Sequence, residues 1–417
     1  MTAAAYKVLE SSWGNEKNRR CKRDQNVFNR GWRLRANSCL ALLAAVLFLA
    51  GCASRPNGVL APVAAEPKVS SSVDMLVATT RAKDATPGVL FSGERGAEMS
   101  LANVVVSIPD ERPIGSVQWP RRVPGDPARD FVTTSVEPVK IANLSNWFNT
   151  YKGKPRKVLI FVHGFNTPFD ASVFRFAQIV HDSDNAAVPV LFSWPSRGRV
   201  LDYNYDRESA NFSRSDLAYV IRAAARSPAV SEVTVMAHSM GSWVAVEALR
   251  QLALQDGRVP AKVKNVVLAS PDLDLDVFRR QMQELGPKRP HMTIFVSSQD
   301  RALRLSQLLS GGVTRVGTID LTREPYLSKF ENIPDVTVID LSLLNNGDRL
   351  NHSKFATSPE IVQLLGGRMA AGQLTNETLA PGAQLGAAAQ ETGQVIGSVA
   401  GVVLSAPVLI FRGATRN

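Results

Sequence analysis

Apolar runs and amphipathic stretches alternate along the middle of the chain. From residue 156, each apolar run is followed by a polar loop and then by a stretch whose apolar residues recur with helical spacing. Strands that are apolar throughout, separated by helices, are typical of a mostly parallel sheet covered on both faces, so we expect an α/β fold. The predicted strands are 157–162, 188–192, 232–238, 263–268, 292–296 and 336–339. The predicted helices are roughly 171–181, 207–225, 242–254, 274–285 and 301–309, with a last one after residue 358.

The region before residue 140 is less regular. Three short apolar runs, at 75–80, 101–108 and 131–136, are separated by loops rich in Gly and Pro. This pattern predicts short strands joined by turns. The sequence contains no internal repeat and no second periodic block, and we therefore predict one folded domain over residues 73–366.

The first 52 residues read as a leader. Arg30, Arg33 and Arg35 precede the apolar run 40–50, which is the layout of a secretory signal and is too short for a stable membrane span. The run ends in the tetrapeptide LAGC, which resembles a bacterial lipobox in which the cysteine, here Cys52, is acylated and becomes the new N-terminus. An ordinary signal peptide or an N-terminal anchor are the alternatives.

The two flanks of the predicted domain differ from it in composition. Residues 53–72 are rich in Pro, Ala and Ser, which predicts a flexible tether. The tail 367–417 is rich in Gly and Ala and contains the uncharged segment 394–411. Glycines recur every four residues from Gly393 to Gly401, a spacing that lets apolar helices approach closely in a membrane. Membrane association, self-association and a disordered tail all remain open for this segment.

Charge and cysteine content narrow the function. The formal net charge is +11, but the leader 1–52 holds nine Lys and Arg against three Asp and Glu, a net of +6, which leaves +5 for the rest. The basic balance is therefore mostly a leader property, and we exclude nucleic acid as a partner. All three cysteines lie in the leader, which excludes disulfides and cysteine catalysis in the body.

A candidate nucleophile follows the predicted strand 232–238. The residues Ala237-His-Ser-Met-Gly241 lie between this strand and a helical pattern. A serine at a sharp strand-to-helix turn needs small neighbours, because the helix must pass close to the strand. The motif resembles the nucleophile elbow of α/β hydrolases, with Ala237 at the first position where Gly is usual. We predict Ser239 as the nucleophile, and the N–H of Met240 would point toward it from the helix N-terminus.

The strand 157–162 ends in a second candidate motif, His163-Gly-Phe-Asn166. In the same fold this loop donates a backbone N–H to the oxyanion, and the glycine permits a close approach of the backbone. We assign the oxyanion hole to the N–H groups of Phe165 and Met240. His163 is interpreted as a structural residue that orients the loop.

The general base is found by elimination among five histidines. The chain order of this fold is serine, acid, histidine, which leaves His291 and His352 after Ser239. His291 starts a predicted strand beside Pro290, whereas His352 lies in a loop after the last predicted strand, so we predict His352. The histidines are His163, His181, His238, His291 and His352.

The acid is predicted to be Asp300. It follows the strand 292–296, where a carboxylate at the end of a strand could hold the histidine tautomer. Asp272 and Asp274, one strand earlier, are the alternatives, although Asp272 fits a helix cap or the edge of the site better. Residues that could line a substrate pocket or pack beside it are Asn166, Trp194, Tyr203 and Tyr205. No phosphate loop, dinucleotide-binding pattern or metal-ligand cluster stands out, so we expect no cofactor and no metal.

Several blocks in order resemble a bacterial family of uncharacterised α/β hydrolases that are often exported or lipoproteins. The resemblance covers about residues 73–366 and implies the α/β-hydrolase fold, the triad and an esterase or lipase-like activity, but no substrate. The blocks are Val77-Ala-Thr-Thr-Arg81, Phe91-Ser-Gly-Glu-Arg95, Phe161-Val-His-Gly-Phe-Asn166, Phe192-Ser-Trp-Pro-Ser196, YNYDRESAN from Tyr203, Ala237-His-Ser-Met-Gly241 and Asn351-His352.

These observations predict an exported serine hydrolase that cleaves carboxylic esters with Ser239, His352 and Asp300 through an acyl-enzyme. Its partners would be an acyl or lipid-like ester and a membrane, bound through lipidated Cys52 alone or together with the segment 394–411. Because Ala53 follows the cysteine where Asp would favour inner-membrane retention, we expect an envelope lipoprotein of the outer membrane or facing the periplasm. The alternatives are a peptidase or acyltransferase on the same triad, or a non-catalytic envelope interaction lipoprotein.

Overall fold

The computed structural model describes residues 55–64, 70–150, 156–184, 186–321, 323, 335–344, 348–371, 402–405 and 408–412. The predicted leader, its lipidation residue Cys52 and the glycines 393–401 lie outside these residues. No helix within the described residues is long and apolar enough to cross a membrane.

The described strands form one mixed sheet with the order β10-β11-β9-β8-β7-β6-β4-β5-β1-β2-β3. The eight central strands, from β11 through β9, β8, β7, β6, β4 and β5 to β1, run parallel to one another. At the two sides of the sheet, β10 pairs antiparallel with β11, and β2 pairs antiparallel with β1 and β3. The strands are β1 Ser70–Lys83, β2 Phe91–Pro109, β3 Val132–Val139, β4 Arg156–Val162, β5 Val188–Ser193, β6 Val230–His238, β7 Val263–Ala269, β8 His291–Val296, β9 Val336–Leu343, β10 Val402–Ser405 and β11 Val408–Arg412.

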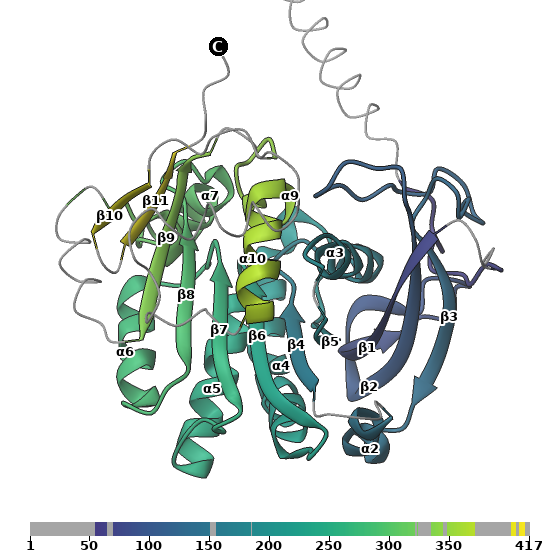
Figure 1. Cartoon of the computed structure of the whole chain (residues 1–417), viewed down its shortest axis with the longest axis horizontal. Helices are drawn as coiled ribbons and strands as arrows, with labels where there is room; N and C mark the ends of the chain where they lie inside the picture. The colour runs from purple at the N-terminus through teal and green to yellow at the C-terminus, as the bar shows by residue number, and fades with distance from the viewer. Residues whose placement is uncertain are drawn as a thin grey trace, which may run out of the picture. The chain divides into compact units, whose positions relative to one another are not determined.

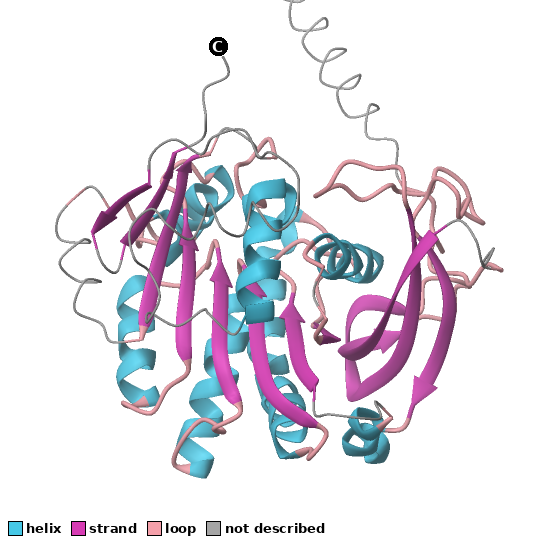
Figure 2. Ribbon diagram, viewed as in Figure 1, coloured by secondary structure: helices cyan, strands magenta, loops and turns pink. Residues whose placement is uncertain are grey.

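Helices cover both faces of the sheet (Figure 2). The α-helices are α2 Leu144–Asn149, α3 Phe169–Asp182, α4 Tyr203–Arg226, α5 Gly241–Asp256, α6 Leu275–Leu285, α7 Arg301–Leu309, α9 Lys354–Thr357 and α10 Pro359–Ala371. Short 3-10 turns are η1 Ile141–Asn143, η2 Val200–Asp202 and η3 Val316–Thr318.

The central strands are apolar throughout because each contributes to two cores. In β4, Val158, Ile160 and Val162 pack in the core beneath α4, α5 and α6, whereas Leu159 and Phe161 pack in the core beneath α3 and α10. Successive side chains of a strand point to opposite faces, so a strand buried on both faces needs no polar positions. The predicted α/β class and mostly parallel sheet are confirmed.

The N-terminal strands are longer than predicted. β1 spans 14 residues and β2 spans 19, and they form one long antiparallel hairpin with register shifts near Arg81. The tether prediction over 53–72 is wrong for its described part. Val59 and Leu60 are buried, and the Leu60 N–H donates to the Gly88 carbonyl. A hydrophobic pair within a Pro/Ala-rich stretch thus binds the chain to the hairpin.

The C-terminal apolar segment 394–411 is described only in part. Within it, Val402–Ser405 and the start of Val408–Arg412 form the strands β10 and β11, and β11 pairs parallel with β9. Strand pairing is not the close helix packing that the glycine spacing suggested for this segment, so the described part adds to the edge of the sheet.

Candidate active site

The predicted site residues follow neighbouring strands at the same edge of the sheet. Gly164, Ser239, Asp300 and His352 come after β4, β6, β8 and β9, all of which point the same way (Figure 1). The strand that follows β4 in the chain, β5, lies on one side of it, whereas β6 lies on its other side, so the strand order changes direction at β4. Open parallel sheets bind ligands at the carboxyl ends of the strands beside such a switch point. Chain topology alone therefore gathers these residues.

Ser239 lies on a sharp turn between β6 and α5. Its φ is +53°, in the left-handed region that a non-glycine residue rarely adopts. Its N–H donates to the Ala269 carbonyl at 2.9 Å and its carbonyl accepts from the Asp272 N–H at 3.1 Å. A Cβ at Gly241 would lie 2.3 Å from the His163 carbonyl oxygen, so only glycine fits there. The turn holds a 3% exposed serine at the N-terminus of α5.

His352 and Asp300 form a hydrogen bond. The Nδ1 of His352 lies 2.7 Å from Oδ2 of Asp300, which is fully buried. The other oxygen of Asp300, Oδ1, accepts from the Leu303 N–H at the start of α7, which fixes the carboxylate. Burial lowers the pKa of His352, but the hydrogen bond and charge of Asp300, with the charges of Asp272 and Asp348, raise that pKa overall.

The loop that carries His352 is held on two sides. Its N–H donates to Oδ1 of Asp348 at 2.7 Å, and its carbonyl accepts from Nε2 of His238 at 3.2 Å. The imidazole rings of His238 and His352 are 4.6 Å apart. Burial and the charge of His352 hold the pKa of His238 well below its ordinary value, so His238 stays neutral. Since His238 precedes Ser239 directly, this contact brings the base loop to the nucleophile turn.

The loop after β4 lies against the nucleophile. A Cβ at Gly164 would lie 2.9 Å from both the Cβ of Ser239 and the Nδ1 of His238. Within the described residues, neither the Phe165 nor the Met240 N–H donates to another group of the chain. Two backbone donors without internal acceptors beside a nucleophile are what an oxyanion hole requires.

The alternative acid Asp272 has other partners. Its Oδ1 accepts from the Ser306 hydroxyl at 2.6 Å and lies 3.2 Å from Nε of Arg315, while its Oδ2 accepts from the Tyr203 hydroxyl at 3.2 Å. None of its hydrogen bonds in the described structure goes to His352. Asp272 is thus part of a buried network at the edge of the site, which agrees with the second of the two roles considered for it.

The alternative acid Asp274 caps a helix. Its side chain accepts from the N–H groups of Asp276 and Val277 at 2.9 and 3.0 Å, which makes it the N-cap of α6. The capping role considered for Asp272 therefore falls to its neighbour two residues later.

Three of the four residues considered for a substrate pocket lie in different surroundings. Trp194 is fully buried, stacks on His163 and donates from Nε1 to the His163 carbonyl, which favours packing, the second of the two roles considered for it. Tyr203 packs edge-on against Phe165 at 5.2 Å and lies beside the oxyanion loop. Tyr205 is enclosed by arginines, with the Arg197 guanidinium 3.6 Å from its ring centroid. Both tyrosines belong to the first turn of α4 rather than to a loop.

The remaining histidines have structural surroundings. His163 is buried against the loop it begins, and burial, with the charge of Arg81, lowers its pKa to about 3, so it is neutral. His181 contacts Arg112 and Asp182 in α3, and His291 contacts Thr337. Within the described residues, no group of three or more His, Cys, Asp or Glu side chains is placed to hold a metal ion.

Two buried charged residues beside the oxyanion loop were not predicted as functional residues from the sequence. Arg81 and Asp206 both lie in the blocks that resemble the family, and they contact the backbone of the loop after Phe165, at Thr167 and Asn166 respectively. A charged residue within an apolar strand, as in the run Met75 to Thr80 followed by Arg81, is the signal that could have marked one of them. Asp206 carries no comparable signal, because its helix start is polar.

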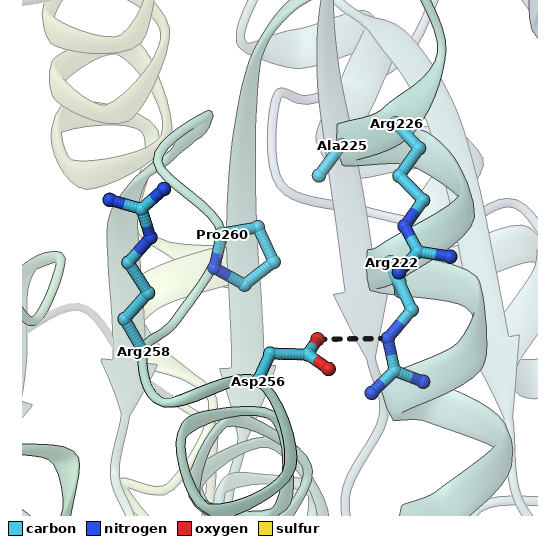
Figure 3. Close-up of a pocket in the computed structure, with 6 residues that line it drawn as sticks. All are labelled: Arg222, Ala225, Arg226, Asp256, Arg258 and Pro260. Carbon is cyan, nitrogen blue, oxygen red and sulfur yellow. Dashed lines mark hydrogen bonds and ion pairs between the residues drawn. The ribbon is translucent and has the colours of Figure 1, made fainter.

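A separate hollow of about 400 Å³ (Figure 3) lies at the opposite end of the strands, away from their carboxyl ends. It is bounded by the ends of α4 and α5 and by the loop before β7. Arg222 donates to Asp256 across it at 3.0 Å. It is remote from the carboxyl ends of the strands and does not belong to the candidate site. Its lining residues are Arg222, Ala225, Arg226, Asp256, Arg258 and Pro260.

Comparison with known proteins agrees with the topology. Residues 140–368 match the family model described as "Alpha/beta hydrolase of unknown function (DUF900)". The uncharacterized protein alr1448 of Nostoc sp. is 30% identical over 135 residues, which cover 26% of this chain and 35% of that protein. The chain thus spans about a third of the length of that curated relative.

Solved structures similar to this chain are distant in sequence. Carboxylesterase CesB of Bacillus subtilis is 10% identical, with a TM-score of 0.33, covering 73% of this chain and 93% of that one. A lipase-esterase related protein of Clostridium acetobutylicum is 10% identical, with a TM-score of 0.29, covering 52% of this chain and 95% of that one. The family match spans more than half of the chain, and the protein therefore belongs to the DUF900 family of α/β hydrolases.

Proposed function

We propose that this protein is a serine hydrolase that cleaves carboxylic esters through an acyl-enzyme. The single observation that carries the proposal is the 2.7 Å hydrogen bond between Asp300 and Nδ1 of His352, on a loop that contacts the residue before Ser239. A carboxylate on Nδ1 fixes the tautomer in which Nε2 accepts a proton, and it stabilises the imidazolium that then forms. The left-handed turn at Ser239 supports the nucleophile.

The reaction follows from these positions. The Ser239 hydroxyl oxygen attacks the acyl carbon while Nε2 of His352 takes the hydroxyl proton. The carbonyl electron pair moves onto the oxygen, which accepts hydrogen bonds from the N–H groups of Phe165 and Met240. His352 then returns the proton to the leaving alcohol. A water molecule then gives a proton to the same histidine and attacks the acyl carbon. The bond from this carbon to the Ser239 oxygen breaks, the histidine returns the proton to that oxygen, and the acid is released.

The substrate class is tested by steady-state hydrolysis of p-nitrophenyl acetate, butyrate and octanoate, beside an equimolar peptide panel. We expect turnover of the esters by the wild-type protein and loss of turnover in Ser239→Ala, with both proteins folded by circular dichroism. Ser242→Ala, three residues after Ser239 and within the first turn of α5, is the matched control and should retain activity. Ester turnover by the Ser239→Ala protein, or turnover of the peptides alone, would contradict the proposal.

We also propose that the protein is exported and lipidated at Cys52, facing the periplasm from the cell envelope. The sequence LAGC at the end of the apolar run supports this. Metabolic labelling with an alkyne-tagged palmitate should mark the wild-type protein and not Cys52→Ser, while Cys39→Ser, the matched leader control, should label normally. Label on Cys52→Ser, or none on the wild type, would refute lipidation at this residue.

A further inference from the structure

Two fully buried charges lie beside the oxyanion loop, and none of the steps above uses them. Arg81 in β1 is 1% exposed and Asp206 in α4 is not exposed at all. Burying a charge without partners costs several kcal/mol or more, so such residues persist where their hydrogen bonds are satisfied. Both residues form hydrogen bonds to backbone groups of the same two loops, the one after β4 and the one after β5.

Arg81 holds three segments of the chain together. Its guanidinium donates to the Thr167 carbonyl at 2.7 Å in the loop after β4, and to the Ser196 carbonyl at 3.0 Å in the loop after β5. It also donates to the Ser92 carbonyl at 3.1 Å and to the Ser193 hydroxyl at 2.9 Å. The rigid fork of an arginine can make these bonds at fixed angles, which a lysine cannot.

Asp206, in α4, forms hydrogen bonds to the same two loops. Its carboxylate accepts from the Asn166 N–H at 3.2 Å, from the Arg197 N–H at 3.1 Å and from the Ser196 hydroxyl at 2.5 Å. The Ser196 hydroxyl in turn accepts from the Thr167 N–H at 3.0 Å. In the oxyanion loop, the Asn166 N–H and the Thr167 carbonyl therefore bond a buried charge directly, and the Thr167 N–H bonds one through the Ser196 hydroxyl.

The conformation of the loop needs such support. Asn166 has a φ of +56°, in the left-handed region, and the carboxylate of Asp206 bonds the N–H of this same residue. Phe165, whose N–H lies in the peptide that joins it to Gly164, comes directly before this strained residue. A backbone donor contributes most to catalysis when its direction is fixed before the reaction begins.

The two charges also influence each other, although they share no hydrogen bond. Burial lowers the pKa of Arg81 to about 9, and the charge of Asp206 opposes this shift. Burial raises the pKa of Asp206, and its hydrogen bonds and the charge of Arg81 oppose that shift. Each charge thus favours the ionised form of the other.

We infer that Arg81 and Asp206 are positioning residues that hold the loop 163–167 in the direction in which the Phe165 N–H binds the oxyanion. The inference rests on the proposed function for the oxyanion, but the holding of the loop can be measured without a substrate. Neither residue touches the substrate, and each acts through backbone groups.

The test compares Asp206→Asn, Arg81→Lys and Ser196→Ala with Thr80→Val. Thr80 precedes Arg81 on β1, and its buried hydrogen bond goes to Ser213 rather than to the oxyanion loop. Thr80→Val therefore controls for the loss of a buried hydrogen bond and of stability. We expect kcat for esters to fall about 10²–10³-fold in Asp206→Asn and Arg81→Lys, the loss typical of one oxyanion donor. Ser196→Ala keeps both charges and should lose about tenfold, the equivalent of one hydrogen bond.

Two readouts separate positioning from general destabilisation. KM should change less than threefold, and the Ki of a trifluoromethyl ketone, which forms a tetrahedral oxyanion with serine, should rise in step with the loss of kcat. Hydrogen exchange in a peptide covering 163–167 should be faster in the variants than in the wild type. Thr80→Val should leave kcat, Ki and this exchange unchanged.

The outcomes are distinguishable. Unchanged exchange at 163–167 in folded Asp206→Asn or Ser196→Ala would overturn the inference, whatever the activity. Faster exchange with unchanged kcat and Ki would also overturn it, because the loop would move without affecting the oxyanion. If exchange becomes faster but Ser239→Ala remains as active as the wild type, the proposed function has failed and the support of the loop stands.

Discussion

The two sides of Ser239 are built in different ways. On the base side, the carboxylate of Asp300 forms a hydrogen bond with the imidazole of His352, the group that we propose transfers the proton. On the oxyanion side, the charges of Arg81 and Asp206 contact backbone groups of the loop that carries Phe165, at Thr167 and Asn166. One side works through the chemistry of side chains and the other through the direction of a peptide bond.

This difference predicts unequal sensitivity to substitution. A side chain that transfers a proton has no replacement, whereas a peptide N–H remains present whichever residue carries it and loses only its orientation. Variants on the base side should therefore cost more activity than variants on the oxyanion side, and the most damaging ones should not be additive.

The largest effect is expected for the base. His352→Ala should lower kcat about 10⁶-fold, and the double variant Ser239→Ala/His352→Ala should cost no more than either single change, because the residues act as a unit. Stopped-flow and long-time hydrolysis of p-nitrophenyl butyrate would measure both. His291→Ala is the matched histidine control. Additive losses would show that His352 and Ser239 do not share a step.

The next effect concerns the acid and the pH profile. Asp300→Asn should lower kcat about 10⁴-fold, because the amide favours the wrong imidazole tautomer. In the proposed reaction the neutral form of His352 accepts the proton, so wild-type kcat/KM should rise with pH through a midpoint above the ordinary pKa of histidine. Removing the charge of Asp300 removes the main cause that raises this pKa, and the residual activity should have its midpoint at lower pH. A midpoint that moves upward would contradict this assignment.

The smallest effect on turnover is expected at Asp272. Asp272→Asn should change kcat less than tenfold, because the carboxylate bonds Ser306 and Tyr203 rather than His352. It leaves the buried guanidinium of Arg315 without its ion-pair partner, so the free energy of unfolding should fall by about 3 kcal/mol. Urea denaturation would measure this loss. A thousandfold fall in kcat without a loss of stability would make Asp272 the acid instead.

The same difference between the two sides decides what could be predicted from the sequence. Histidine is scarce, and the end of a strand is visible as the end of an apolar run, so His352 and Asp300 could be selected by elimination and order, and the structure places them in contact. The strand positions from β4 to β9 were predictable for the same reason, since a doubly buried strand leaves a continuous apolar run.

Residues that act on the backbone could not be selected in this way. The carbonyl that Arg81 bonds at Thr167 is 86 positions away, and the one at Ser196 is 115 positions away, so no local pattern reports the contact. Whether Trp194 lines a pocket or packs beside it could not be decided from the sequence, because its contact with His163 joins residues 31 positions apart. The early start of α4 was missed because the polar residues of its first turn bond other loops rather than showing an amphipathic period.

The central claim is that Ser239 is a nucleophile activated by His352. Intact-protein mass spectrometry after incubation with a fluorophosphonate tests it most directly, since the probe bonds an activated serine with loss of fluoride. The account predicts one adduct on the folded wild-type protein, mapped by peptide analysis to Ser239, with labelling abolished in Ser239→Ala and slowed by orders of magnitude in His352→Ala. An unlabelled folded wild-type protein, or an adduct that persists in Ser239→Ala, would contradict it.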